Sequence, residues 1–160
     1  MKFRFEQVIE SSREGVFAFH ADPSNLAVLF AGRPAFRLLH HDGGIRPGCV
    51  TWIEETVAGC APVVMGFRHT IYEPPDRFGE ELIHGPYERF VHIHEFEERT
   101  EAATLVRDRL DVSLPWQYGG EAAIRWIVAP MIRSTFGFRQ RALRKLAAAG
   151  DLMKQAASYR

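Results

Sequence analysis

Residues 35–114 form an almost unbroken series of strand-like segments, and this series limits the fold more than any other feature of the sequence. The separators are strong turn signals: Asp42-Gly43-Gly44, Pro47-Gly48, Pro74-Pro75-Asp76, Gly85-Pro86 and the charged run Glu98–Glu101. Such short connections join antiparallel neighbours, because parallel strands need a long crossover. The sequence therefore predicts an antiparallel meander of the strands Ala35–Leu39, Cys49–Thr56, Val63–Tyr72, Arg77–His84, Tyr87–Glu97 and Ala103–Leu114.

The segments on either side of this meander have different patterns. The chain begins with alternating apolar and polar residues, which indicate a further half-buried strand. Ser11 and Ser12 then offer the N-cap of a short helix, and a second short helix is predicted over Leu26 to Phe30. After the meander, Gly119-Gly120 begins a helix that continues to about Ala149, with a kink expected at Pro130.

This order of elements predicts the architecture. A sheet of six or seven antiparallel strands is too wide to lie flat against a single helix. It can bury one face only by curling around that helix, and the curl leaves a hollow. We therefore predict an α+β fold, in which a curved six- to seven-stranded sheet wraps the long C-terminal helix. Without a linker or an internal repeat, residues 1–160 are expected to form a single ligand-binding domain.

Four stretches of the sequence resemble the START/SRPBCC superfamily: SSREGVFAFHADPSNL (11–26), YEPPDRF (72–78), GPYERFVHIHEF (85–96) and LVRDRLDVSLP (105–115). The chain is similar to small bacterial SRPBCC proteins, in a superfamily that includes the birch-pollen allergens and polyketide cyclase/dehydrase-like domains. The resemblance implies the helix-grip fold with an internal cavity. Members bind lipids, steroids, polyketides or hormones and only some are enzymes, so the resemblance does not fix an activity.

Side-chain alternation predicts which residues of the last two strands face the hollow. The charged side chains of Arg107 and Arg109 must lie outside, so the residues that alternate with them face inward. On the preceding strand, two phenylalanines flank two histidines on one face, which favours the inward orientation of that face. The predicted inward set is Phe90, His92, His94, Phe96, Val106, Asp108 and Leu110.

The pairing of these two strands predicts the partner of Asp108. If Glu98–Glu101 is the connecting loop, opposite residues have numbers that sum to about 200. His92 is then expected opposite Asp108, and His94 opposite Val106. A buried carboxylate must be paired or protonated, and histidine is a natural partner for it.

Neighbouring strands and the C-terminal helix supply the rest of the predicted site. The helix residues of this site share one face at helical spacing. The predicted ligand-binding residues are Phe67, His69, Phe78, Glu80, Phe90, His92, His94, Phe96, Val106, Asp108, Leu110, Ile124, Val128, Met131 and Thr135.

The sequence leaves several roles open for His92, His94 and Asp108. They can form a structural hydrogen-bonded group, orient a ligand, or transfer protons, with His92 and Asp108 as the candidate catalytic residues. The two histidines of His-x-His lie about 7 Å apart on one face of a strand, which suits a metal when a carboxylate completes the set. Oxygenase domains of this fold that hold iron carry their motif on a helix, and this chain has no match to it. We therefore expect no metal and no cofactor.

The composition excludes several classes of partner. Lysine plus arginine and aspartate plus glutamate each number 20, so no global field attracts nucleic acid. No stretch approaches the roughly 18 apolar residues of a membrane span, and the alternating start MKFRFEQVIESS does not resemble a signal peptide. Cys49 and Cys60 lack metal-type spacing. We expect a cytoplasmic protein with reduced thiols and without stable membrane insertion.

Three functions are compatible with these patterns. The leading hypothesis is a non-enzymatic protein that binds or carries a hydrophobic small molecule, lipid-like or aromatic and polyketide-like, in its cavity. It rests on the predicted hollow and on the lack of a nucleophile elbow or a phosphate-binding loop. The first alternative is a cyclase- or dehydratase-like enzyme in which His92 and Asp108 act as acid–base groups. The second is a structural or interaction module with a filled core.

Overall fold

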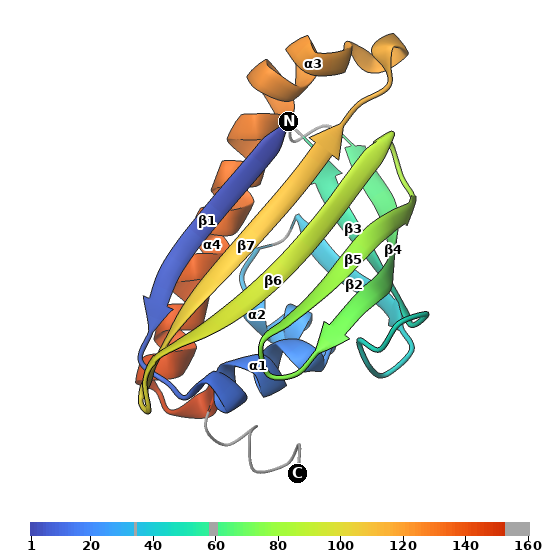
Figure 1. Cartoon of the computed structure of the whole chain (residues 1–160). Helices are drawn as coiled ribbons and strands as arrows, with labels where there is room; N and C mark the ends of the chain where they lie inside the picture. Colours follow the sequence, from blue (N-terminus) through green and yellow to red (C-terminus); the bar gives the residue numbers. More distant parts are fainter. Residues whose placement is uncertain (34, 58–60, 153–160) are drawn as a thin grey trace.

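The computed structural model describes residues 1–33, 35–57 and 61–152. A seven-stranded antiparallel sheet curls around a long C-terminal helix, and two short helices follow the first strand, which confirms the predicted helix-grip architecture (Figure 1). The elements are β1 (Lys2–Ile9), α1 (Arg13–Ala21), α2 (Asn25–Leu29), β2 (Phe36–His41), β3 (Val50–Val57), β4 (Ala61–Glu73), β5 (Arg77–His84), β6 (Arg89–Thr100), β7 (Ala103–Ser113), a 3-10 turn (Trp116–Tyr118), α3 (Gly120–Ala123), a π-helical turn (Ile124–Val128) and α4 (Ala129–Ala148).

The sheet consists of the predicted meander with β1 added at one edge. Its order is β1-β7-β6-β5-β4-β3-β2, so the strands from β2 to β7 are neighbours in chain order. β1 pairs with β7, with Phe3 opposite Leu110 and Ile9 opposite Thr104. The two edges of the sheet are therefore β1 and β2, and α4 crosses the concave face between them (Figure 1).

The predicted facing of β6 and β7 is confirmed. On β7, Val106, Asp108 and Leu110 are only 1–3% exposed. Arg109 is exposed on the opposite face, where its guanidinium lies 3.1 Å from the carboxylate of Glu95. The charged residues of the convex face thus pair with one another, while the alternating set lies against the helix.

The predicted register between these two strands is wrong by two residues. β6 continues to Thr100, beyond its expected end at Glu97, whereas β7 begins at Ala103 as expected. Thr100 therefore pairs with Ala103, and most of the charged run belongs to the hairpin strands instead of a loop. His94 lies opposite Asp108, and His92 lies opposite Leu110. A shift of two residues keeps every side chain on the same face, so the inward set is right although the directly opposite residues are not. His92, now diagonal to Asp108, still contacts it at 3.0 Å.

The short helices close one end of the curved sheet (Figure 1). α1 begins after Ser12, whose hydroxyl accepts a hydrogen bond of 3.3 Å from the amide of Gly15. Phe17 is 2% exposed, and its ring meets the rings of Phe78 and Phe96 with centroid distances of 6.1 and 5.6 Å. These edge-on aromatic contacts hold α1 against the inner face of the sheet.

The long helix is irregular just before Pro130 and regular after it. Residues Ile124–Val128 form a π-helical turn, and Pro130 lies in the first turn of α4. A proline in a continuous α-helix would lack one hydrogen bond and clash with the carbonyl of Trp126, four residues earlier. The wide turn avoids that clash. The disturbance predicted at Pro130 is therefore present, but it takes the form of a wider turn in the preceding residues.

The core consists of two apolar clusters. One contains Phe96, Val106 and Leu143 and lies toward α1. The other contains Leu110, Val128 and Phe136 and lies toward the π-helical turn. Between the two clusters, β6, β7 and α4 bury polar or charged side chains. These are His92, His94, Asp108 and Arg139, which we call the polar layer.

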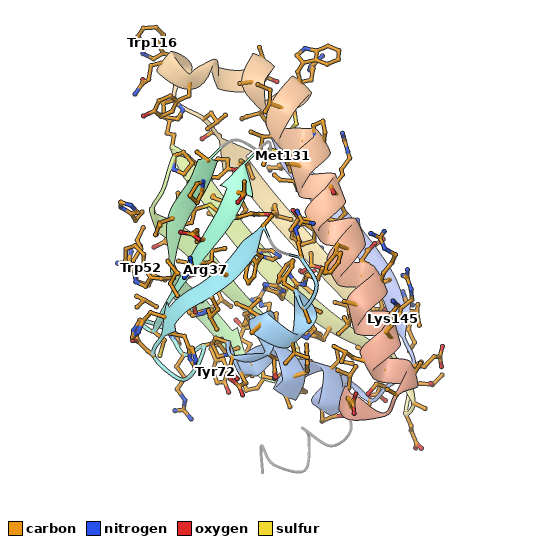
Figure 2. The ribbon with its side chains drawn as sticks, turned by 180° about the vertical axis from the view of Figure 1, so that it is seen from behind. Arg37, Trp52, Tyr72, Trp116, Met131 and Lys145 are labelled. Atoms are coloured by element: carbon orange, nitrogen blue, oxygen red, sulfur yellow. The ribbon has the colours of Figure 1, made fainter. Side chains whose placement is uncertain are left out.

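The end of the molecule beyond β7 exposes large apolar side chains. Trp116 and Trp126 are 86% and 77% exposed, and Trp116 points away from the sheet (Figure 2). No helix among the described residues is long and apolar enough to cross a membrane. The thiol of Cys49 is free, and Cys60 lies outside the described residues.

Candidate functional site

Asp108 is the centre of the polar layer. Its Oδ1 atom lies 3.0 Å from Nε2 of His92, 2.9 Å from Nδ1 of His94 and 3.4 Å from Nη2 of Arg139. β6 supplies the two histidines, β7 the carboxylate and α4 the guanidinium. All four residues are 3–7% exposed. The layer thus links the sheet to the helix through charge-assisted contacts in a buried environment.

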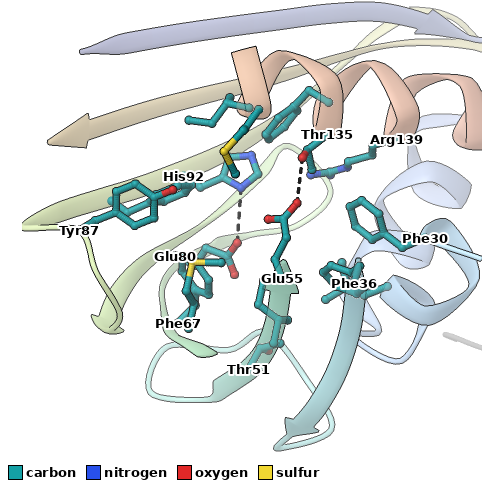
Figure 3. A pocket seen from close by; sticks show the side chains of 17 residues that line it. Phe30, Phe36, Thr51, Glu55, Phe67, Glu80, Tyr87, His92, Thr135 and Arg139 are labelled. Atoms are coloured by element: carbon teal, nitrogen blue, oxygen red, sulfur yellow. Dashed lines mark hydrogen bonds and ion pairs between the residues drawn. The ribbon is translucent and has the colours of Figure 1, made fainter. Parts of the chain in front are cut away.

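A second carboxylate approaches His92 from the neighbouring strand β5. Oε1 of Glu80 lies 3.4 Å from Nδ1 of His92, whose Nε2 contacts Asp108. The imidazole therefore stands between two carboxylates. The other oxygen of Glu80 lies 3.8 Å from Nδ1 of His69, and Nε2 of His69 lies 3.3 Å from the hydroxyl of Thr51. Figure 3 shows the contact between Glu80 and His92 at the cavity wall.

The surroundings divide these groups into charged and neutral ones. Burial alone would lower the pKa of His92, but its hydrogen bonds to Asp108 and Glu80 outweigh burial and raise it. Burial would likewise raise the pKa of both carboxylates. The charge of Arg139 and the bonds from the two histidines hold the pKa of Asp108 well below its usual range, and His92 and His69 lower that of Glu80 to about 2.

His94 behaves in the opposite way to His92. Burial, together with the nearby cationic His92 and Arg139, lowers the pKa of His94 well below its usual value. Two carboxylates, the guanidinium and one imidazolium thus share the buried region, and their charges offset one another. Such balance is what a low-dielectric interior requires of ionised groups.

A cavity of about 110 Å³ lies beside these groups, and Glu80, His92 and Arg139 form part of its wall (Figure 3). Most of its wall is apolar, and a few polar side chains converge on it. Glu55 on β3 accepts a hydrogen bond of 2.9 Å from Thr135 on α4 and pairs with Arg33 at 3.2 Å. The lining residues are Leu26, Phe30, Phe36, Thr51, Ile53, Glu55, Met65, Phe67, Glu80, Tyr87, Phe90, His92, Met131, Ile132, Thr135, Phe136 and Arg139.

A smaller cavity of about 60 Å³ adjoins the first one, and Leu26, Thr51, Glu80 and Arg139 line both. Its wall is more polar. The other lining residues are Phe19, His20, Asp22, Pro23, Asn25, Leu29, Ile45, His69, Phe78 and His94.

The structure brings nine of the fifteen predicted ligand-binding residues to one of these two cavities: Phe67, His69, Phe78, Glu80, Phe90, His92, His94, Met131 and Thr135. The other six pack elsewhere. Asp108 lies behind His92, and Phe96, Val106, Leu110, Ile124 and Val128 belong to the two apolar clusters. The inward face of the sheet therefore divides into a cavity wall and a packed core, which alternation alone does not distinguish.

Arg139 is a cavity-lining residue that the sequence analysis did not select. It lines both cavities and contacts Asp108. Its position carried a signal, because Met131, Thr135 and Arg139 follow one another at intervals of four and share one face of α4. Glu55 was missed for a similar reason, although it alternates with Thr51 and Ile53 on the cavity side of β3.

One set of residues in the described part of the chain has the donor types and spacing for a metal ion. Ligand atoms of Glu80, His92 and His94 lie within 4.8 Å of one another. A metal would require His92 to lose the proton that its two carboxylate partners favour. It would also place a second cation near Arg139. The charge pattern therefore favours the hydrogen-bonded network over a metal centre.

No family model and no curated protein matches this sequence. Solved structures do match it. A protein from Thermus thermophilus has a TM-score of 0.73 and 16% identity over 94% of this chain and 99% of its own. A protein from Chromobacterium violaceum has a TM-score of 0.70 and 16% identity, covering 91% and 96%.

Norcoclaurine synthase from Thalictrum flavum, solved in complex with dopamine and hydroxybenzaldehyde, has a TM-score of 0.69 and 11% identity, covering 93% of this chain and 87% of its own. Norcoclaurine synthase is a Bet v1-like SRPBCC protein. These solved structures share the fold of this chain, and similarity at such low identity shows the fold alone.

Proposed function

We propose that this protein binds a hydrophobic small molecule in the cavity between the sheet and α4. The observation that carries the proposal is an internal cavity with a mostly apolar wall and a few convergent polar groups, the usual form of a small-molecule site. The fold supports it, since norcoclaurine synthase holds dopamine and hydroxybenzaldehyde on the same architecture. Among the functions compatible with the sequence, a binding or carrier role requires the fewest further assumptions.

The size of the cavity limits the ligand. Apolar cavities of about 150 Å³ in protein interiors bind benzene. A cavity of about 110 Å³ therefore suits a single ring or a short aliphatic group. Burial of roughly 150 Å² of apolar surface stabilises such a complex by about 4 kcal/mol before ordering costs are subtracted.

Toluene provides a direct test, because it is apolar and has the size of one ring. We expect saturable binding in calorimetry and shifts of amide resonances around the cavity. In Met131→Trp, the indole should fill the cavity and abolish binding while the fold survives. Ser134→Trp is the matched control, since Ser134 is exposed on the same helix and should leave binding unchanged. If neither toluene nor other apolar compounds of this size bind to the wild-type protein, the proposal fails.

A second candidate function is acid–base catalysis on a bound carbonyl compound. It is favoured by the position of Glu80 and His92, which line the cavity in contact with each other. Asp108 lies behind His92, so in this function it would orient the imidazole instead of reacting itself. Cyclohexanone in deuterated buffer provides the test, since a base near its α-carbon exchanges the α-hydrogens for deuterium. Exchange at the rate of buffer alone, or an equal rate in His92→Phe, would rule this function out.

A further inference from the structure

The smaller cavity contains two buried nitrogen atoms that have no hydrogen-bond partner among the described residues. They are Nε2 of His20 and Nδ1 of His69. Both residues line this cavity. Buried polar atoms are nearly always paired, so two unpaired ones beside the same space point to a group that occupies it.

One of the two nitrogens needs a hydrogen-bond donor and the other needs an acceptor. Nδ1 of His20 lies 2.8 Å from the carbonyl oxygen of Val16 and therefore carries the hydrogen. Burial lowers the pKa of His20 to about 4, so its ring is neutral and Nε2 is an acceptor without a donor.

His69 provides the complementary atom. Its Nδ1 faces the ionised carboxylate of Glu80 at 3.8 Å, which is beyond hydrogen-bond distance but favours a hydrogen on that nitrogen. Nε2 then accepts from the hydroxyl of Thr51, 3.3 Å away. Nδ1 of His69 is thus a donor without an acceptor, in a side chain that is 3% exposed.

The charges of the wall select among polar groups. A carboxylate in this cavity would lie near Glu80, and an ammonium group would lie near Arg139. A neutral hydroxyl avoids both repulsions. It offers both the donor that Nε2 of His20 lacks and the acceptor that Nδ1 of His69 lacks, whereas a carbonyl or an ether offers only an acceptor.

We propose that the smaller cavity binds a hydroxyl group of the ligand whose apolar body fills the larger cavity, so that the ligand is a phenol or an alcohol. The inference rests on the proposed function, because the apolar body needs the larger cavity. The arrangement supports it, since Glu80 and Arg139 line both spaces and a single molecule can extend from one into the other.

Toluene and 4-methylphenol test this inference, because they differ by one hydroxyl group. In a purely apolar cavity the hydroxyl is a disadvantage, since it loses its hydrogen bonds to water. We expect the opposite order here. 4-Methylphenol should bind roughly tenfold more tightly than toluene, the factor that corresponds to one net hydrogen bond. Calorimetric titration of both compounds measures the ratio.

Ring-preserving variants locate the hydroxyl. His69→Phe and His20→Phe each remove one unpaired nitrogen and should cut the preference for 4-methylphenol to less than about threefold, while the affinity for toluene stays within about twofold. His40→Phe, an exposed histidine remote from both cavities, is the control and should keep the full preference. If one buried variant does not fold, the other still measures the effect.

The outcomes separate the two proposals. If neither compound binds, the proposed function fails and this inference with it. If both bind equally, or toluene binds more tightly, the larger cavity binds ligand but the smaller one holds only water. A preference that persists in both His69→Phe and His20→Phe places the hydroxyl elsewhere and overturns the assignment.

Discussion

At the scale of single residues, one oxygen of Asp108 contacts three side chains from two other elements. His92, His94 and Arg139 all approach it within 3.4 Å in a buried environment. Removal of such a charge takes a carboxylate from buried Arg139 and leaves buried His92 with Glu80 alone. This is more costly than the loss of a surface ion pair. The contribution of this residue to stability should also depend on pH, because one of its partners titrates.

Asp108→Asn should therefore lower the free energy of unfolding by about 3 kcal/mol, with the larger deficit at pH 5.5 than at pH 8. The pKa of His92 is raised in the folded state, so its contribution is present below its unfolded pKa and is lost as the pH rises through the folded value. Asparagine removes the main cause of that rise and thus the low-pH contribution. Urea unfolding at both pH values measures the difference, and the control is Asp111→Asn, on the outward face of the same strand, where half-buried Asp111 pairs with Arg89. An equal loss of unfolding free energy at pH 5.5 and at pH 8 would show that Asp108 does not act through His92.

Much of this network could be predicted from the sequence. The alternation of Asp108 with Arg107 and Arg109 was sufficient to predict that Asp108 is buried. The phenylalanines on either side of the histidines were sufficient to predict that His92 is buried. Arg139 could not be found in this way, because a lone charge on a helix is normally a solvated one. Its burial depends on a carboxylate supplied by a strand about thirty residues earlier, which only the three-dimensional arrangement brings near.

At the scale of elements, the helix starts are determined locally, whereas the details of strand pairing are not. The sequence offered Ser11 and Ser12 as caps of α1, and the structure uses the hydroxyl of Ser12. The hairpin between β6 and β7 differed from prediction, because the charged residues before Thr100 have a strand conformation that their polarity does not indicate. The π-helical turn before Pro130 could not be predicted either, because a kink and a wider turn both relieve the clash between the proline ring and the preceding turn.

Loss of the α1 cap should be measurable. Ser12→Ala removes the acceptor for the amide of Gly15 and should reduce the free energy of unfolding by about 1 kcal/mol. Chemical denaturation followed by circular dichroism provides the measurement. Ser134→Ala changes an exposed serine on α4 and should alter stability by less than about 0.5 kcal/mol. If the two variants are equally stable, the hydroxyl of Ser12 does not cap the helix.

At the scale of the whole molecule, a polar layer separates two apolar clusters of the core, and residues of that layer line two cavities. A cavity represents packing contacts that the folded protein does not make. A ligand that supplies them binds the native state alone and raises its stability by mass action.

Toluene at ten times its dissociation constant should thus stabilise the native protein by about 1.4 kcal/mol and raise the thermal midpoint by roughly 3–6 °C. Scanning calorimetry at several toluene concentrations measures this rise. Met131→Trp should show no rise with toluene, because its cavity is already filled. A rise of the same size in that variant would place the bound toluene outside the cavity.

The positions of the tryptophans determine what can be observed with ultraviolet light. Trp116 and Trp126 are largely exposed, and Trp52 lies over Gly66 on the outer side of the sheet (Figure 2). The described residues that line the two cavities include no tryptophan. Two of the three indoles therefore emit much as they do in water, whether or not a ligand is bound in the cavity. The tryptophan emission reports the surface of the protein, and a molecule that enters between the sheet and the helix leaves that emission almost unchanged.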